Sequence, residues 1–288
     1  MQTHLTLQKL LTMVLVTGFC LPAVVAQSNT SSAREHFERA VSFSTTQDPR
    51  AEDEYKQAIA DRGGIYPEAW EGLIRYLAHA LRFEEAVAAC RKYLKQTNKK
   101  VPPAALEYLQ RLERSASLKS KSDKGQPLTL EERLELVRLV DGFGSKGDAV
   151  PYAEKAVELY PDSAKVLVAL AELIKREQRE RALELLNRAI AFEPNDPSVY
   201  VIRGGYFFWV QGNSVAAELD FRKAIELSQG SNAPAWAGLG DSLAREGRRD
   251  EAIAAYRQYL SIRPESAAHY DGEIRKSIEM LRNGSPKP

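Results

Sequence analysis

Apolar residues recur along the second half of the chain with a fixed spacing. An alanine is followed by an apolar residue four positions on and by alanine or tyrosine three positions further, in four sets that begin at Ala149, Ala182, Ala217 and Ala252. The sets begin 33, 35 and 35 residues apart, and three of them are followed by a proline. Spacings of three and four residues place side chains on one face of a helix. The pattern therefore predicts one helix with a buried face in each repeat.

A second helical pattern precedes each set and is clearest in the stretch "WAGLGDSL" (Trp236 to Leu243). Two such helices can pack as a hairpin, because a small residue such as Gly240 lets the backbones approach and a large one such as Tyr256 fills the space beside it. Proline ends the second helix, since it lacks an N–H group and clashes with the preceding turn. One hairpin cannot bury its apolar stripe alone, so we expect successive hairpins to stack.

Together with Ala252, Tyr256 and Pro264, this stretch matches the tetratricopeptide pattern, which has a period of ~34 residues. The chain resembles a tetratricopeptide-repeat (TPR) protein, most strongly from Pro127 to Pro264. The resemblance implies an all-α fold, a right-handed solenoid of helix-turn-helix hairpins whose first helices line a concave groove. By the same resemblance, that groove binds peptides or partner proteins.

The repeat also predicts the domain organisation. The predicted segments are degenerate N-terminal hairpins at 33–114, a linker or long loop at 115–127, four hairpins at 128–264 and a capping helix at 265–283. The linker is predicted because "SASLKSKSDKGQ" is polar, rich in Ser and Lys, and aperiodic. After it, Thr129 and Glu132 predict a capping box that opens the third hairpin.

The run "GGYFFWVQG" (Gly204 to Gly212) departs from the one-sided pattern, because it is apolar all the way round. Counting forward from Pro194 places Gly204 and Phe207 in the packing positions, whereas counting back from Ala217 selects Gly205 and Phe208. This hairpin therefore carries one extra residue. We expect the helix to absorb it as a one-turn π-bulge, a feature often found at functional sites. In either frame one of the two phenylalanines belongs to the core.

Two aromatic residues of this run, Tyr206 and Trp209, are left over by the packing pattern. We predict that they face the groove, whose floor is then aromatic and whose margins are charged; the alternative is that both pack under the neighbouring hairpin as ordinary core. The predicted partner-binding residues are Tyr206, Trp209, Phe208, Val201, Val168, Lys165, Glu172, Asp241 and Arg245. Such a groove suits an extended or helical peptide with apolar anchors.

The first 26 residues differ from the rest of the chain. Lys9 precedes an uncharged stretch that ends in "VVA" at Ala26, which predicts a secretory signal peptide cleaved after Ala26. The protein is then periplasmic or secreted. The alternative, an uncleaved N-terminal membrane anchor, is disfavoured because the apolar span falls short of the ~20 residues that cross a bilayer. Cys20 follows Phe19 rather than the small residue that precedes the cysteine of bacterial lipoprotein signals.

Charge and cysteine content narrow the class of partner. Without residues 1–26 the chain carries as many basic as acidic residues, 39 of each. This balance provides no basic surface for nucleic acid or for an anionic membrane. We expect a monomer with a protein or peptide partner, no nucleic acid, and no membrane insertion after signal cleavage. Cys90 is the one cysteine left, so an internal disulfide is excluded and the core must stabilise the fold.

Two short motifs imitate catalytic or nucleotide-binding signatures. "GFGSKG" (Gly142 to Gly147) follows a helix rather than the strand that a dinucleotide loop requires, so we interpret it as the turn inside the third hairpin. "GDSL" (Gly240 to Leu243) lies on a repeat helix, and the Asp-x-x-His pair that accompanies it in GDSL-type hydrolases is missing. The histidines His36, His79 and His269 are scattered. We therefore predict no catalytic, cofactor-binding or metal site.

These observations favour a non-catalytic interaction scaffold that holds a segment of a partner in the groove of hairpins four to six. One alternative is a structural subunit of a cell-envelope assembly, which a large apolar patch outside the groove would favour. Another is the regulatory TPR array of an enzyme partner. Some TPR co-chaperones hold a C-terminal carboxylate with lysines and asparagines on their first helices, and the groove residues predicted here do not form that clamp.

Overall fold

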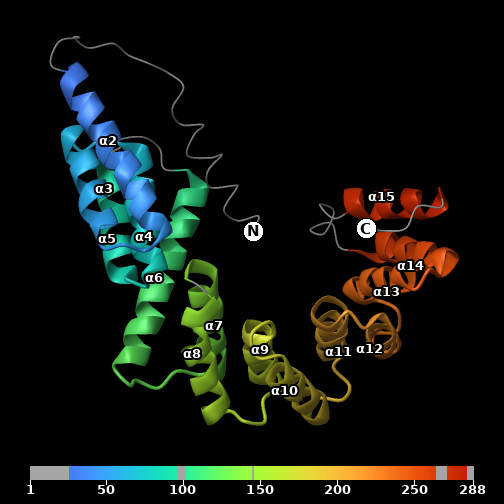
Figure 1. Ribbon diagram of the computed structural model, residues 1–288. Helices are drawn as coiled ribbons and strands as arrows, with labels where there is room; N and C mark the ends of the chain where they lie inside the picture. Colours follow the sequence, from blue (N-terminus) through green and yellow to red (C-terminus); the bar gives the residue numbers. More distant parts are fainter. Residues whose placement is uncertain (1–25, 97–101, 145, 264–270, 284–288) are drawn as a thin grey trace. The chain divides into compact units, whose positions relative to one another are not determined.

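The computed structural model describes residues 26–96, 102–144, 146–263 and 271–283, and every regular element in these ranges is a helix (Figure 1). The expected all-α fold of helical hairpins is thus confirmed. The predicted signal segment lies outside the described residues, apart from Ala26. Among the helices that are described, none combines the length and the apolar character needed to cross a bilayer.

The chain divides into two compact units, Met1–Ala149 and Val150–Pro288. The first unit contains α2 (Ala26–Thr45), α3 (Arg50–Asp61), α4 (Pro67–His79), α5 (Phe83–Gln96), α6 (Pro103–Asp123) and α7 (Leu130–Phe143). The boundary falls in the first turn of α8 (Lys146–Leu159). The second unit continues with α9 (Ala164–Ile174), α10 (Arg179–Phe192), α11 (Pro197–Tyr206), the π-helix η2 (Phe207–Gln211), α12 (Ser214–Leu227), α13 (Ala233–Arg245), α14 (Arg249–Ile262) and α15 (Asp271–Arg282).

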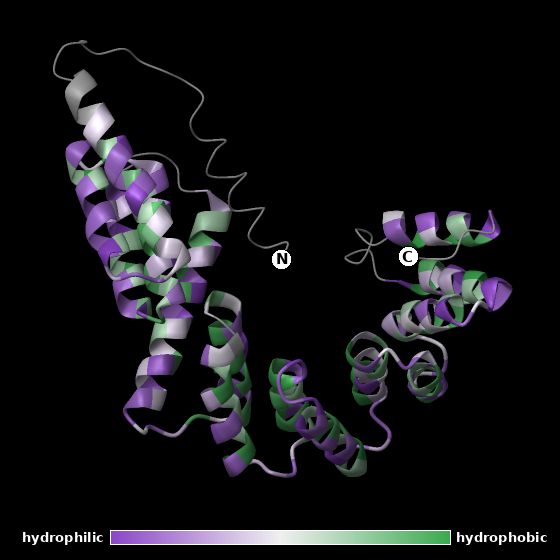
Figure 2. Ribbon diagram, viewed as in Figure 1, coloured by the Kyte–Doolittle hydropathy of each residue, from purple (hydrophilic) through white to green (hydrophobic). Residues whose placement is uncertain are grey.

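Consecutive helices pack in pairs within each unit. In unit 1, α2 packs on α3 and α4 on α5; in unit 2 the pairs are α9 with α10, α11 with α12, and α13 with α14. The first helices of neighbouring hairpins also meet, since α2 contacts α4 and α11 contacts both α9 and α13. Hydrophobic and hydrophilic residues alternate along the helices of both units, as expected for helices that each bury one face (Figure 2).

The segment predicted to be a linker is largely helical, which corrects that prediction. Helix α6 continues through it to Asp123. Ser115 and Leu118 are fully buried on one side, and the Ser115 hydroxyl donates to the backbone carbonyl of Arg111 at 2.7 Å. Lys119 and Asp123 form an ion pair one turn apart at 2.6 Å. A narrow buried stripe and pairs of this kind hold a polar helix together, although its composition is typical of a loop.

The predicted capping box at the start of α7 is confirmed. The Thr129 side chain accepts a hydrogen bond from the Glu132 backbone N–H at 3.2 Å, and the Glu132 carboxylate accepts one from the Thr129 N–H at 3.1 Å. These two reciprocal bonds satisfy two N–H groups that the first turn of a helix leaves without partners.

At the other end of the chain, α15 packs on α14, and Ile274, Ile278 and Leu281 join the core of unit 2.

Glycines on the first helices make room for aromatic rings from the second helices. A Cβ atom built on Gly238 would lie 2.4 Å from the ring of Phe221, and one on Gly204 would lie 2.9 Å from the same ring. Phe221 of α12 is therefore held between its own first helix, α11, and the next one, α13. In unit 1 a Cβ on Gly72 would lie 2.3 Å from the Tyr55 ring. The close approach of backbone to ring requires a residue without a side chain.

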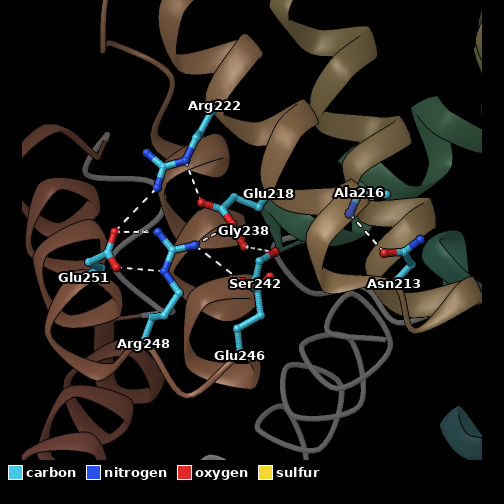
Figure 3. A network of polar contacts seen from close by, with 9 residues as sticks. All are labelled: Asn213, Ala216, Glu218, Arg222, Gly238, Ser242, Glu246, Arg248 and Glu251. Carbon is cyan, nitrogen blue, oxygen red and sulfur yellow. Dashed lines mark hydrogen bonds and ion pairs between the residues drawn. The ribbon is translucent and has the colours of Figure 1, made fainter.

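A glutamate on a second helix links successive hairpins through arginines (Figure 3). Glu218 of α12 is nearly buried and accepts hydrogen bonds from Arg222, one turn on, and from Arg248 at the N-terminus of α14, both at 2.7 Å. Arg248 also pairs with Glu251 of α14 at 2.6 Å. Its guanidinium thus lies between two carboxylates from different hairpins.

The same network occurs in unit 1, with every member 166 positions earlier in the sequence. Glu52 of α3 pairs with Lys56 at 2.6 Å and with Arg82 at 2.5 Å, and Arg82 pairs with Glu85 of α5 at 2.5 Å. Two junctions between hairpins, one in each unit, therefore use an identical arrangement of charges.

The contact between the Phe221 ring and Gly238 predicts that adding a single methyl group at Gly238 destabilises the protein. Gly238→Ala should lower the free energy of unfolding by about 1–3 kcal/mol, because the added methyl group overpacks a ring that α11 confines on its other side. Gly205→Ala is the matched control: a Cβ there has no atom within 4 Å, so the change should be neutral or stabilising by up to ~1 kcal/mol. Urea unfolding measures both, and equal effects would contradict the packing described.

The charge network predicts a pH dependence. Burial raises the pKa of Glu218, but hydrogen bonds from Arg222 and Arg248 and their charges outweigh it and leave this pKa below its usual value. The stabilisation is then present above the unfolded pKa of about 4.3 and is lost as the pH falls through the lower folded pKa. Glu218→Gln should cost about 1–3 kcal/mol at pH 7, and the loss should shrink toward pH 3.

The control for that experiment is Glu226→Gln, since Glu226 lies on the same helix and forms only an exposed pair with Lys223. It should change the free energy of unfolding by less than about 1 kcal/mol. Thermal or urea unfolding at pH 7 and at pH 3 provides the comparison. A loss for Glu218→Gln that is equal at the two pH values would show that the paired carboxylate is not its source.

Candidate functional site

The first helices α9, α11 and α13 form one side of unit 2, and the middle helix ends in a π-turn. After Tyr206 the chain continues as η2, in which the Gly212 N–H donates to the carbonyl of Phe207, five residues back. Gly212 adopts a left-handed backbone with φ 69° and ends the helix. The Asn213 side chain then accepts from the Ala216 N–H at 3.0 Å and caps α12.

This π-turn absorbs the extra residue that the sequence indicated, so the expected π-bulge is confirmed. Before the turn, Gly204 is the residue that contacts Phe221, as the forward count predicts, while a Cβ on Gly205 would meet nothing. After the turn, Phe208 is the buried core residue and Phe207 is only partly buried, as the backward count predicts. Both counts therefore hold, each on its own side of the turn.

Trp209 is the most exposed large apolar residue of the chain as described, with 72% of its surface accessible. Its ring contacts the Phe208 ring nearly at right angles, with centroids 4.6 Å apart. The Arg245 guanidinium of α13 lies over Phe208 at 3.7 Å from the ring centroid, and its Nη1 donates to the Phe208 carbonyl at 3.0 Å. Phe208, Trp209 and Arg245 are called the aromatic cluster below.

The structure corrects two of the predicted partner-binding residues. Tyr206 is buried, with 1% of its surface accessible, and its hydroxyl donates to the Arg179 carbonyl at the start of α10 at 2.8 Å. Phe208 is buried in the core shared by α12, α13 and α14, and its ring contacts the exposed Trp209 ring. Tyr76 of unit 1 similarly donates to the Asp48 carbonyl just before α3. The two tyrosines stand at different spacings from the packing glycines Gly72 and Gly204, so the shared hydrogen bond is visible in the structure and not in the sequence.

Two predicted charged residues have partners within their own hairpins. Asp241 accepts a hydrogen bond from the Tyr256 hydroxyl at 2.7 Å, and burial together with the Asp241 charge raises the pKa of Tyr256. Glu172 pairs with Lys175 at 2.8 Å. Arg245 is exposed and is the charged residue of the predicted set that contacts Phe208.

The remaining predicted residues lie on α9 and α11. Val168 and Val201 are partly buried, and Val201 packs against the core of unit 2. Lys165 is exposed at the start of α9. Their place on the first helices agrees with the repeat pattern, and their contact with a partner stays a prediction.

A cleft in unit 1 was missed by sequence reasoning, which placed recognition in hairpins four to six. The cavity has a volume of about 620 Å³ and lies between α2 and α4, with Phe37, Val41 and Tyr55 on its apolar side. Glu71 and Arg75 line it as an ion pair at 2.6 Å, and burial raises the pKa of Glu71 despite that arginine. The first helices α2 and α4 thus form a concave surface in unit 1.

The residues that imitate catalytic chemistry have structural roles. Ser242 of the "GDSL" stretch is fully buried, and its hydroxyl donates to the Gly238 carbonyl at 2.9 Å. The "GFGSKG" stretch joins α7 to α8, two helices. Cys90 is buried, and burial raises its thiol pKa to about 11. Within the described ranges, no three His, Cys, Asp or Glu residues gather as a metal site would require.

Comparison with known protein families identifies the repeat. The model of the tetratricopeptide repeat family matches residues 49–101 and 208–267. The chain is a TPR protein. In unit 1 the matched residues include α3, α4 and α5, and in unit 2 they include most of η2 and all of α12, α13 and α14, so the aromatic cluster lies inside a matched segment. No curated protein matches the sequence significantly.

Two solved structures are similar to this chain. A crystal structure of MamA is 21% identical, with a TM-score of 0.47, and the similarity covers 59% of this TPR protein and 99% of MamA. A tetratricopeptide repeat protein from Parabacteroides merdae ATCC 43184 is 18% identical, with a TM-score of 0.47 and coverage of 88% and 100%.

Tryptophan fluorescence tests the exposure of Trp209 in this TPR protein. Trp70 is buried, and Trp236 is partly buried with its indole N–H bonded to the Gly230 carbonyl at 2.9 Å. Trp209→Phe should therefore remove most of the emission that acrylamide quenches and shift the remaining maximum to the blue. Trp236→Phe is the control and should leave the quenchable emission in place. An unchanged quenching curve for Trp209→Phe would contradict the exposed position.

Proposed function

We propose that this TPR protein is a non-catalytic scaffold that binds a segment of a partner protein on the first-helix side of unit 2, with Trp209 as the anchor. TPR arrays are protein-interaction modules, and their first helices supply the recognition surface. The observation that carries the proposal is the exposure of Trp209, 72% of whose surface is accessible although the ring is fixed against Phe208. A fixed, exposed tryptophan is typical of an interface anchor.

The aromatic cluster is suited to binding because its parts are already ordered. Phe208 is buried, and Arg245 is held by both its ring and its carbonyl, so little side-chain freedom remains to be lost when a partner binds. An apolar side chain of the partner would cover the free face of Trp209, and a polar or acidic group beside it would reach the exposed edge of Arg245. An extended or helical segment with one apolar anchor fits this arrangement.

We also propose that the protein acts after export, as a monomer, in a periplasm or outside the cell. The support is the apolar segment that ends at Ala26, together with a charge balance that provides no surface for nucleic acid. Structural support of a cell-envelope assembly is the second candidate function. It is favoured by Val215 and Leu219, two exposed apolar residues on α12, outside the first-helix side.

Affinity capture with the purified chain tests the anchor. Proteins of the exported fraction of the source cell would be captured with wild type, with Trp209→Ala and with Phe192→Ala, an exposed aromatic residue at the end of α10. We expect wild type and Phe192→Ala to retain the same partner, and Trp209→Ala to retain at least tenfold less, because truncation of an anchor costs about 2 kcal/mol or more. Equal recovery with all three would exclude Trp209 as the anchor.

A further inference from the structure

Helix α12 exposes two large aliphatic side chains one turn apart. Val215 and Leu219 have 61% and 67% of their surface accessible. They lie on the side of α12 opposite to Ala217 and Phe221, which are buried in the core of unit 2. Val215 and Leu219 are called the α12 ridge below. Its place on a second helix separates it from the first-helix side that carries Trp209.

The ridge is an exception among the second helices of this chain. At the two positions that Val215 and Leu219 occupy relative to the first alanine of their set, the other second helices carry Pro49 and Asp53, Glu84 and Ala88, Gly147 and Pro151, Glu180 and Glu184, and Asp250 and Ala254. Charged or small residues are what a solvated helix face requires. Among the second helices that the structure describes, α12 alone has a large aliphatic residue at both positions.

A cavity of about 870 Å³ begins beside this ridge. Its apolar lining includes Leu183 of α10 and Val210 of η2, and Asn213, which caps α12, also lines it. Asn213 precedes Val215 by two residues, so this edge of the cavity lies near the N-terminal end of the ridge. A hollow with a mixed polar and apolar lining, formed by α10 and by the end of η2, thus lies close to the N-terminal end of the apolar ridge.

Helix α10 contributes two acidic side chains to the lining of the cavity. Glu180 and Glu184 line it one helical turn apart, and neither has an ion pair with any residue that the structure describes. Like charges at this spacing disfavour the helix. Arg179 and Arg188 also border the cavity, so its lining carries two basic and two acidic side chains; the Arg188 guanidinium donates to the Pro161 carbonyl in the preceding turn at 3.2 Å. A cation from outside the chain would relieve the repulsion between the two glutamates.

We propose that the α12 ridge and this cavity dock an amphipathic helix of a partner protein, whose apolar stripe is flanked on one side by lysine or arginine. Two apolar residues at i and i+4 form the ridge that enters the groove of a facing helix. The cavity receives an apolar side chain of the same stripe, and the basic flank pairs with Glu180 and Glu184. Trp209 belongs neither to the ridge nor to the cavity lining, so each site can be tested with its own variants.

Two synthetic helical peptides labelled with fluorescein provide the probe. Both carry the same leucine stripe; one has lysines and the other glutamates along one flank. Fluorescence anisotropy with the full purified chain should give a Kd at least tenfold lower for the lysine peptide. Leu219→Glu should weaken binding of that peptide at least tenfold. Ala254→Glu, a change at the same position of α14, should leave its Kd within about twofold of wild type.

A double variant, Glu180→Lys with Glu184→Lys, should reverse the preference so that the glutamate peptide binds more tightly. Circular dichroism and Tm of Leu219→Glu should equal those of wild type, because the side chain is exposed. Equal Kd values for the two peptides, no binding of either, or an unchanged Kd in Leu219→Glu would overturn the proposal. So would a dimer in sedimentation, or binding to phosphatidylglycerol vesicles, that Leu219→Glu abolishes, since the ridge would then serve a second copy or a membrane.

Discussion

The contact between the Phe221 ring and two glycines is the constraint on which unit 2 depends. Gly204 on one side and Gly238 on the other belong to the first helices of successive hairpins. A single aromatic side chain thus fixes the distance within one hairpin and the distance to the next. It brings α11 and α13 close enough to meet, which gives the first helices a shared side.

The same constraint explains the π-turn and the exposed tryptophan. Gly204 must meet Phe221 on one side of the turn, and Phe208 must enter the core of α12 to α14 on the other side. With one extra residue in this hairpin, a regular α-helix cannot place both Gly204 and Phe208 in these contacts. The backbone therefore forms a π-helix over Phe207–Gln211. The residue that follows Phe208 is then left without a packing position. Trp209 is exposed as a consequence of the packing on either side of it.

The sequence predicted the parts of this structure that a period of three to four residues encodes. The hairpins, the capping box at Thr129 and the π-turn all follow from the spacing of apolar residues and of capping side chains. The helix over 115–123 was not predicted, because its buried face consists of Ser115 and Leu118 alone. The remaining residues are as polar as those of a typical loop. A stripe that narrow produces little periodic signal.

The spacing of apolar residues also did not predict the contacts between hairpins. The buried Tyr206 donates a hydrogen bond to the carbonyl of Arg179, 27 residues earlier, and Arg248 donates one to Glu218, 30 residues earlier. The cavities beside α4 and α10 likewise form between helices of different hairpins. Such features can be found in the sequence only by comparing one repeat with another, as the matching networks of Glu52 and Glu218 show.

Native-state amide hydrogen exchange along unit 2 tests the central constraint most directly. Because the Phe221 ring ties α11, α12 and α13 together, the most protected amides of these three helices should open with one shared free energy and one shared dependence on denaturant. If α13 exchanged through an opening of its own, at a clearly lower free energy, while α11 and α12 stayed protected, the ring would not couple the hairpins and the account would be contradicted.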